Sequence, residues 1–397
     1  MHDVKKVTLQ AMLLEALFWM SSCAYGSFIV TTLTDYGYSS ATATALMTVM
    51  AAVSFVAQPI TGYLCDNYFS QRKAFLVLIG CSVPLYLLLT FSMKSLPLTV
   101  LFMFLLTLAM QQVPGLVDAW VVHMQGRYPG LNYGLCRGTG SLMYAVAAQV
   151  MGGLTVAWGH DLRMIVGAVL GVGALVVAWR LGEMPSLPST DDPVPAVPRR
   201  LSTGETVRRM EKNHTYLLLL GMSFALFLGS SCISTFMPVL VADLGGDSGH
   251  VGTAFAVTAL SEVPAMFLMR AILRRFPARR VLIFGCFFYV TRLTLTCLSP
   301  NLTAMLAIQL LQGLSFAVLW PASINYLNRI VEDEIKSTAV MTYTSVTLGI
   351  SGIFGNAIGT MILSATDNVR LVFAFSACSA AVGLALGIFG LVRRIWK

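Results

Sequence analysis

Charged residues are scarce in this sequence. Asp, Glu, Lys and Arg make up only 11% of its 397 residues, against about a quarter of a typical soluble protein, and 56% of the residues are hydrophobic. This composition excludes an ordinary soluble domain and predicts an integral membrane protein. A removable signal peptide is not expected, because MHDVKK at the start runs into a long apolar stretch without a small-residue cleavage pattern.

Patterns for nucleotide, metal and disulfide chemistry are also missing. No GxxxxGK[ST] loop occurs, and GTGS at 138–141 lies inside an apolar stretch rather than after a strand. The eight cysteines include no CxxC pair and no metal-type spacing, so we interpret them as small apolar residues. We therefore expect no enzymatic activity, no cofactor and no metal, and an ion gradient as the energy source of any transport.

Apolar stretches long enough to cross a bilayer dominate the chain. A hydrocarbon core of about 30 Å needs roughly 20 apolar residues per helix. Twelve such stretches lie near 8–33, 41–63, 74–93, 97–123, 134–158, 164–182, 214–241, 251–272, 281–299, 302–328, 338–363 and 371–391. The expected fold is an all-α polytopic membrane protein with twelve transmembrane helices.

One long polar interruption divides these helices into six and six. Residues 183–213 carry five prolines and a mixed cluster of charges, which is typical of a linker. We therefore predict an N-terminal six-helix bundle at 1–183, a cytoplasmic linker at 184–213 and a C-terminal six-helix bundle at 214–397.

The Lys and Arg residues predict the orientation. Of the 26, 21 fall on one side of the predicted helices, Lys94, Arg163 and Arg370 fall on the other, and Arg137 and Arg292 fall within the membrane. Because basic residues accumulate on the cytoplasmic side, both termini and the linker are expected there. The net charge of +8 needs no nucleic acid partner, since basic loops that face anionic lipids explain it.

Two loops repeat each other weakly. QPITGYLCDNYFSQRK at 58–73 and VPAMFLMRAILRRFPARR at 263–280 both run from a proline through a helix end to a basic pair, about 206 residues apart. Two similar halves around a central site are the architecture of many secondary transporters.

GYLCDNYFSQRK resembles the loop motif between helices 2 and 3 of the major facilitator superfamily. It departs from that motif by one extra residue and by Asn67 and Phe69, where a basic residue and glycine are usual. The resemblance implies the superfamily's fold of two pseudo-symmetric bundles and assigns a cytoplasmic gate to Gly62, Asp66, Arg72 and Lys73. The alternative is an ordinary solvated loop.

YGLCRGTGSLMYAVAAQVMGG, which begins at residue 133, resembles helix 5 of the oligosaccharide:proton symporters, the lactose permease-like group with nucleoside and phenylpropionate relatives. The matching positions are Gly134, Arg137, Gly140, Ser141 and Tyr144. The resemblance implies that Arg137 pairs with Asp118 and holds solute hydroxyls, that Tyr144 stacks on the solute, and that Ser141 belongs to the same site.

The second half offers a similar pair, Glu262 and Arg292, in the relative order that the group uses. The stretch QLLQGLSFAVLW departs from lactose permease, since Gln309, Gln312 and Ser315 replace its lysine, histidine and glutamate. Lactose itself is therefore not implied. The resemblance places Gln312 at a position that contacts the substrate.

Ionisable residues within a membrane each cost at least about 2.5 to 3.5 kcal/mol, so they should be paired or should line a watery cavity. At about 1.5 Å per helical residue, Asp118 and Arg137 reach comparable depths, and so do Glu262 and Arg292. We interpret both pairs as ion pairs that couple transport to protons. The alternative is that they only lock neighbouring helices.

Glu15 is the fifth charge within the membrane. Trp19, Ser22 and Gly26 follow it at i+4, i+7 and i+11, so all four share one helix face that can line a cavity. The stripe predicts that Trp19 contacts solute and that Glu15 carries a proton. The alternative partner for Glu15 is a loop cation or a lipid headgroup.

These observations together predict proton-coupled symport of a small polar solute, such as a sugar, oligosaccharide or nucleoside, by alternating access in a bacterial inner membrane. We expect protons, the solute and the lipid bilayer as partners, and a monomer. Sodium in place of the proton, uptake of an aryl carboxylate, and proton-driven export of drugs or metabolites stay open. A receptor or scaffold would need a soluble module, and the linker at 184–213 is the only candidate for one.

Overall fold

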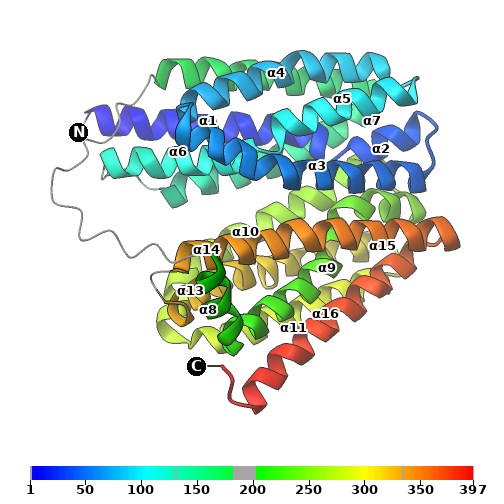
Figure 1. Cartoon of the computed structure of the whole chain (residues 1–397). Coiled ribbons are helices and arrows are strands. Elements are labelled where there is room, and N and C mark those ends of the chain that lie inside the picture. Colours follow the sequence, from blue (N-terminus) through cyan, green and yellow to red (C-terminus); the bar gives the residue numbers. More distant parts are fainter. Residues whose placement is uncertain (1, 129, 132, 182–202, 333–334, 397) are drawn as a thin grey trace. The chain divides into compact units, whose positions relative to one another are not determined.

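The computed structural model describes residues 2–128, 130–131, 133–181, 203–332 and 335–396, and within these residues the regular structure is entirely helical (Figure 1). The helices of the N-terminal part are α1 (His2–Gly26), α2 (Ile29–Asp35), α3 (Ser40–Asn67), α4 (Gln71–Ser92), α5 (Leu96–Met110), α6 (Val113–Arg127) and α7 (Tyr133–Leu181). The remaining ones are α8 (Thr203–Lys212), α9 (His214–Asp243), α10 (Ser248–Arg275), α11 (Ala278–Cys297), α12 (Leu302–Ile308), α13 (Phe316–Ile330), α14 (Lys336–Thr344), α15 (Ser351–Thr366) and α16 (Val369–Val392). A 3₁₀ segment, η1 (Gln309–Gly313), joins α12 to α13, and a π-helical segment, η3 (Ser345–Ile350), joins α14 to α15.

Eleven helical runs in the described residues are long and apolar enough to cross a membrane. The run Tyr133–Leu181 has 49 residues, about 74 Å at 1.5 Å per residue, or more than twice the thickness of a bilayer core. Gly159 breaks this run with φ 83°, a conformation that glycine adopts without strain. The run therefore holds two of the twelve predicted helices, and the all-α polytopic fold is confirmed.

Several of these helical runs are interrupted. Between α5 and α6 the break falls at Gln111 and Gln112, just before Pro114 in the first turn of α6. Proline has no N–H and clashes with the carbonyl four residues back, so a continuous helix is disfavoured at this point. Such breaks leave polar backbone groups at membrane depth, where they are tolerated when they are buried in protein or line a cavity.

The chain divides into two compact units, each defined by the contacts among its own residues. The first comprises Met1–Pro185 with Met237–Leu260, and the second comprises Ser186–Phe236 with Ser261–Lys397. The predicted bundle limits at 183 and 214 stay a prediction, and residues 184–202 of the expected linker lie outside the described residues. Of the rest of that linker, Thr203–Lys212 forms the helix α8.

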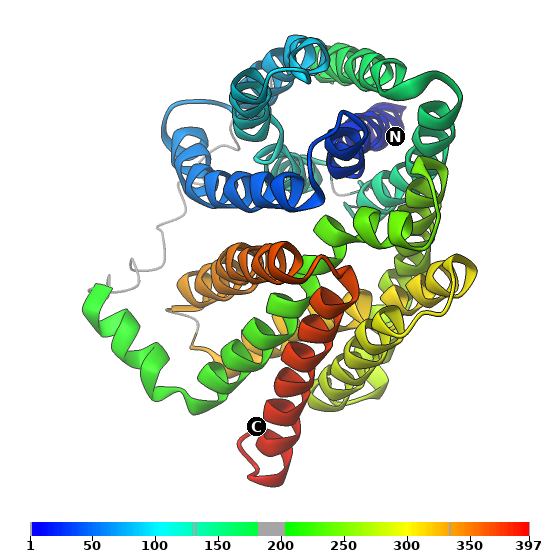
Figure 2. The same ribbon diagram turned by 90° about the vertical axis from the view of Figure 1, so that its right-hand side faces the viewer.

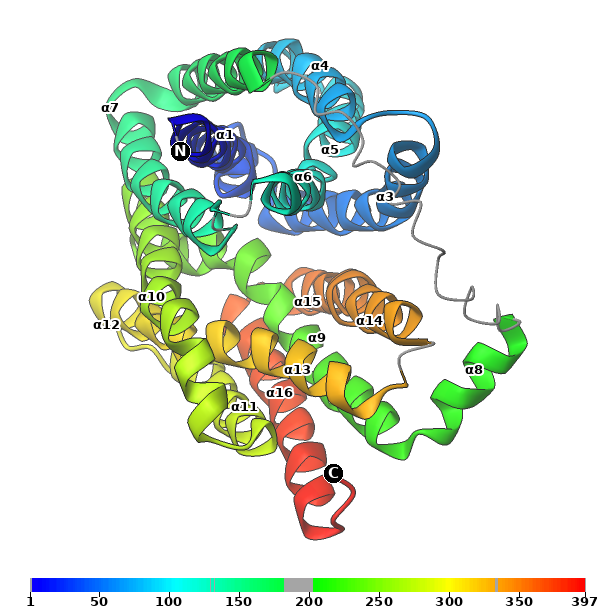
Figure 3. The same cartoon turned by 90° about the vertical axis from the view of Figure 1, so that its left-hand side faces the viewer.

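In the first unit, α1 packs along α7, and α4 packs on both α7 and α5 (Figure 3). Side-chain hydroxyls fasten α1 to its neighbours: Tyr86 donates to the Ser21 carbonyl at 2.8 Å, and Ser21 donates to the Gly167 carbonyl at 2.8 Å. A carbon added at Gly167 would lie 2.6 Å from the Ala24 side chain, so this glycine permits the close approach of α7 to α1. The buried position of α1 fixes the side chains that it carries.

In the second unit, α11 packs against α16 and α13 (Figure 2). Buried tyrosines are tied to neighbouring helices by hydrogen bonds. Tyr343 lies 2.8 Å from the Ser223 hydroxyl, and Tyr289 lies 2.5 Å from the Ser230 hydroxyl. The phenol ring fills apolar space while its hydroxyl finds a partner, which is how buried tyrosines are usually satisfied.

Candidate functional site

Arg137 is the centre of a polar cluster in the first unit. Its Nη1 donates to the Ser141 hydroxyl at 3.0 Å, one helical turn along α7. Its Nε lies 3.7 Å from Asp118 Oδ1 on α6, and the two side chains are 28% and 36% exposed. The predicted ion pair therefore forms, but it is long and partly open. A pair of this kind can be separated by a competing hydrogen-bonding group at a modest cost.

Trp19 on α1 connects this ion pair to Glu15. The guanidinium carbon of Arg137 lies 4.4 Å from the centre of the Trp19 ring, which is a cation–π contact. The Trp19 indole N–H donates to Glu15 Oε2 at 2.9 Å. Glu15 is fully buried, and its Oε1 has no hydrogen-bond partner among the described residues. The predicted stripe on the first helix thus contacts the predicted solute residues on α7.

Gly140 lets the two helices approach at this point. A side-chain carbon added there would lie 2.6 Å from Trp19 Cδ1 and 3.1 Å from Glu15 Oε2. No other residue type leaves that space open, so glycine positions Trp19 between Glu15 and Arg137.

Tyr144 completes the cluster. Its ring meets that of Trp19 edge to face at 6.1 Å, and its hydroxyl lies 2.6 Å from the Ser27 hydroxyl. Ser27 stands at the break between α1 and α2. The residues predicted from the first half are thus brought together on α1, α6 and α7, with Asp118, Arg137, Ser141 and Tyr144 around Trp19.

A second polar cluster lies in the second unit around Arg292 on α11, whose side chain is buried. Gln309 Oε1 accepts from Arg292 Nε at 3.2 Å and from Nη2 at 2.7 Å. Gln312 Oε1 accepts from Arg292 Nη1, and Gln312 Nε2 donates to Glu262 Oε1 at 2.7 Å. The predicted partners Glu262 and Arg292 are therefore linked through the Gln312 amide.

The 3₁₀ segment η1 explains why both glutamines reach one arginine. Residues at i and i+3 eclipse each other in a 3₁₀ turn, so Gln309 and Gln312 lie one above the other. Gly313, next in sequence, donates its N–H to the Ser261 hydroxyl at 3.1 Å, and a carbon added there would lie 2.2 Å from the Ser261 carbonyl oxygen. This contact holds η1 against α10 beside Glu262.

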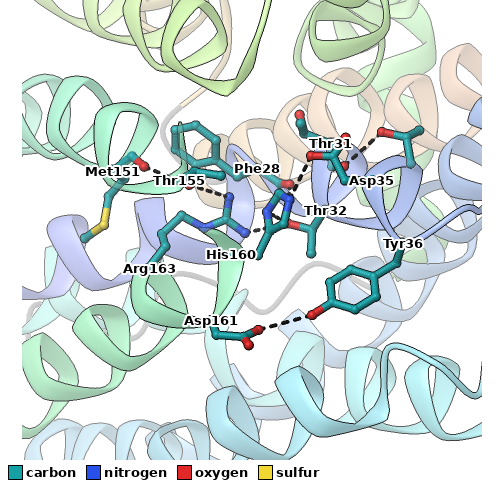
Figure 4. Close-up of polar contacts among 11 residues, drawn as sticks. Phe28, Thr31, Thr32, Asp35, Tyr36, Met151, Thr155, His160, Asp161 and Arg163 are labelled. Atoms are coloured by element: carbon teal, nitrogen blue, oxygen red, sulfur yellow. Dashed lines mark hydrogen bonds and ion pairs between the residues drawn. The ribbon is translucent and has the colours of Figure 1, made fainter. Parts of the chain in front are cut away.

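A third buried cluster surrounds Arg163, which the sequence reasoning placed in a loop (Figure 4). Arg163 is fully buried, and its guanidinium donates to the Thr155 and Thr32 hydroxyls and lies 4.8 Å from the Phe28 ring centre. His160 Nδ1 lies 3.2 Å from the Thr32 hydroxyl oxygen, and His160 Nε2 lies 2.7 Å from Asp35 Oδ2.

The Arg163 cluster joins α2 to α7 next to the break at Gly159. A cavity of about 410 Å³ in the same unit is lined by Thr31, Asp35 and Thr155, among others. A signal for Arg163 was present in the sequence, because an arginine on the side that is otherwise poor in basic residues calls for an explanation.

Comparison with known proteins decides the family. A model of the family described as the MFS_1 like family matches residues 13–375, most of the chain. The chain belongs to the major facilitator superfamily. The transporter is 25% identical to the maltose permease of Geobacillus stearothermophilus over 345 residues, 86% of this chain and 84% of the permease. It is 23% identical to the uncharacterised transporter YwbF of Bacillus subtilis strain 168 over 313 residues, 78% and 74% of the two chains.

Solved structures show the same fold. A variant of the nucleoside transporter NupG matches with a TM-score of 0.78 and 14% identity, over 98% of this transporter and 100% of that chain. An autoinhibited peptide transporter of the POT family matches with a TM-score of 0.75 and 11% identity, over 97% and 96%. The transporter is thus a multi-pass membrane protein that moves a small molecule rather than an enzyme.

The gate motif of the transporter is described only in part. The surroundings of Gly62 and the side chain of Asp66 lie outside the described part of the structure, so the predicted roles of both residues stay predictions. Arg72 donates from Nε to the Ala178 carbonyl at 3.1 Å and from Nη2 to the Trp179 carbonyl at 3.0 Å. These carbonyls belong to the last turn of α7, where a cation is favourable. Lys73 follows as the second basic residue, in the first turn of α4.

Proposed function

We propose that this transporter is a proton-coupled symporter that takes up a small polar solute, a sugar, oligosaccharide or nucleoside, by alternating access. The observation that carries the proposal is Glu15, which is fully buried, has no hydrogen-bond partner on Oε1 among the described residues, and contacts the residue that stacks on Arg137. The resemblance of the whole chain to a maltose permease supports a solute of this class.

The buried position of Glu15 suits a group that gains and loses a proton. An ionised carboxylate away from water is costly unless both oxygens are compensated, and within the described part of the chain only Oε2 receives a hydrogen bond, from Trp19. A bound proton removes the charge at once. Loss of that proton places a negative charge on Glu15, which the Trp19 ring separates from Arg137. The protonation of Glu15 and the position of the Arg137 guanidinium therefore depend on each other.

The solute would be bound by Arg137 and the residues around it. The guanidinium offers several donors in a plane, Ser141 and Tyr144 offer hydroxyls, and Trp19 offers an aromatic face. Solute hydroxyls that accept from Arg137 would replace its long contact of 3.7 Å with Asp118. Solute binding would thereby release Asp118 from Arg137. The same arginine would then respond both to the solute and to the proton.

Glu262, Gln312 and Arg292 would serve as the second coupling element. Gln312 accepts from Arg292 and donates to Glu262, and a guanidinium only donates, so this amide can turn only if it leaves Arg292. Protonation of Glu262 would weaken the hydrogen bond that its carboxylate accepts from Gln312 Nε2. In this proposal Gln312 contacts the solute when it turns away from Arg292.

Location, energy source and assembly follow from the same proposal. We propose a bacterial inner membrane, cytoplasmic termini, a proton gradient as the driving force and a monomeric unit. The excess of Lys and Arg in the loops on the side of both termini supports the orientation.

The test is to record external pH in lightly buffered, de-energised cells that express the transporter while sugars, nucleosides and aryl carboxylates are added in turn. Alkalinisation by a sugar or nucleoside, lost in Arg137→Ala and kept in Arg127→Ala, is the expected result. Arg127 is exposed at the end of α6, which makes it a matched control. Absence of any response, with drug-dependent proton release from loaded vesicles, would instead indicate an exporter.

A further inference from the structure

A second polar cavity in the first unit lies where α5 gives way to α6. It has a volume of about 450 Å³, within the range of roughly 300 to 1,000 Å³ for small-molecule sites. Its walls include Gln58 and Thr61 of α3, Gln71 at the start of α4, and Gln111 and Gln112 at the helix break. Four primary amides line this cavity, and Gln112 is the buried one among them.

Gln112 is the residue that indicates a ligand. Its side chain is only 5% exposed, yet neither Oε1 nor Nε2 has a hydrogen-bond partner among the described residues. A buried amide left without partners costs about 1 to 3 kcal/mol per group. Since Gln112 lines the cavity, a rotation of its side chain would bring both atoms to a molecule bound there.

The helix break itself is a feature of binding sites in transporters. Discontinuous helices place free backbone groups and polar side chains where a substrate can reach them. Here α5 ends at Met110 and α6 begins at Val113, so Gln111 and Gln112 belong to neither helix. Pro114 favours the break, because it has no N–H to donate to the carbonyl of Met110, four residues back.

The chemistry of the walls selects the class of ligand. Each amide both donates and accepts, and a hydroxyl group does the same, so a molecule with several hydroxyls can match every amide. A carboxylate only accepts and would leave the amide oxygens unmatched. The cavity therefore favours an uncharged, polyhydroxylated solute over an aryl carboxylate.

The cavity is also connected to the Arg137 cluster. Its wall includes Gly115 and Ala119 of α6, and the same helix carries Asp118 toward Arg137. A solute that fills the cavity would thus fix the turn of α6 from which Asp118 projects.

We propose that this cavity is a binding subsite for an uncharged, hydroxyl-bearing solute, with Gln112 as its main recognition residue. The inference rests on the proposed function, because it names the substrate class of the same transporter. It assigns a further specificity-determining residue outside the cluster around Arg137.

The test measures equilibrium binding of maltose, uridine and phenylpropionate to purified protein without a proton gradient, for example from intrinsic tryptophan fluorescence. Gln112→Leu should weaken binding of the hydroxylated probe about tenfold or more, and Gln111→Leu should act in the same direction. Gln125→Leu is the matched control, because Gln125 is exposed on α6 and does not line the cavity. Binding to that variant should equal that of the wild type.

The melting temperature separates recognition from a structural role. Removing an unpartnered buried amide should leave the ligand-free melting temperature of Gln112→Leu unchanged or higher. A lower melting temperature with unchanged affinity, equal affinity in Gln112→Leu and wild type, or binding of phenylpropionate alone would overturn the proposal. Because no gradient is used, a failure of proton coupling leaves this result intact, and unchanged binding in Gln112→Leu leaves the symport proposal intact.

Discussion

Arg137 and Trp19 stack on each other, with the guanidinium carbon 4.4 Å from the indole ring centre, while the other side of the same indole is tied to Glu15 by a hydrogen bond of 2.9 Å. A protonatable carboxylate and the residue proposed to bind solute are therefore separated by a single rigid ring. Any movement of Arg137 toward a solute changes the surroundings of the indole and so of Glu15. This relationship gives the proposed coupling a physical route.

Arg137→Lys tests whether the planar guanidinium is required. Lysine keeps the charge but cannot stack on Trp19 while donating to Ser141, and the loss of about 1 to 2 kcal/mol corresponds to a roughly five- to thirtyfold fall in solute affinity. The measurement is the concentration dependence of uptake at equal expression. Arg127→Lys serves as control, and equal affinity in Arg137→Lys and wild type would show that only charge matters.

Gly140→Ala tests the packing that positions Trp19. The new methyl group would meet Trp19 Cδ1 at 2.6 Å, so the indole must move away from Arg137 or Glu15. We expect strongly reduced uptake at a normal expression level. Gly153→Ala on the same helix is the control, because a carbon added at Gly153 meets nothing within 4 Å. Similar uptake in both variants would contradict the proposed geometry.

Gln309→Ala tests the second cluster through stability. Arg292 would lose its bonds from Nε and Nη2 to one buried oxygen, and leaving buried donors of a charged group unpaired costs about 1 to 3 kcal/mol or more. The melting temperature of purified protein should fall clearly. Gln125→Ala should leave it unchanged. An unaltered melting temperature in Gln309→Ala would mean that water or another group replaces the amide.

Thr32→Val tests the Arg163 cluster. The Thr32 hydroxyl accepts from Arg163 and lies 3.2 Å from His160, so its removal leaves a buried guanidinium with fewer partners. We expect a loss of about 1 to 3 kcal/mol in stability. The control is Thr291→Val, because the Thr291 hydroxyl donates within its own helix, to the Phe287 carbonyl at 2.9 Å. Equal melting temperatures for the two variants would exclude a supporting role for Thr32.

The fold could be predicted from the sequence because hydrophobic length is a strong signal in a membrane protein. The ranges predicted for the twelve helices agree closely with the observed runs. The prediction could not give the breaks within those runs, such as that at Gln111 and Gln112, because hydropathy averages over many residues. The break at Gly159 falls between two predicted helices, 134–158 and 164–182.

The residues of the candidate site could be predicted from the sequence more fully than the contacts between them. Asp118, Arg137 and Trp19 lie together because charged side chains within membrane spans have few other partners available. The hydrogen-bonded bridge from Arg292 through Gln312 to Glu262 depends on a 3₁₀ turn that the sequence does not predict. The burial of Arg163 was not predicted, because hydropathy placed this residue between the predicted helices 134–158 and 164–182.

Glu15→Gln in proteoliposomes tests whether Glu15 carries the proton, with two assays on the same preparation. Glutamine resembles the protonated acid but cannot release a proton. We expect this variant still to exchange labelled for unlabelled solute across the membrane, while accumulation driven by a pH gradient is abolished. Full gradient-driven accumulation by Glu15→Gln, at the wild-type rate, would mean that Glu15 does not carry the proton.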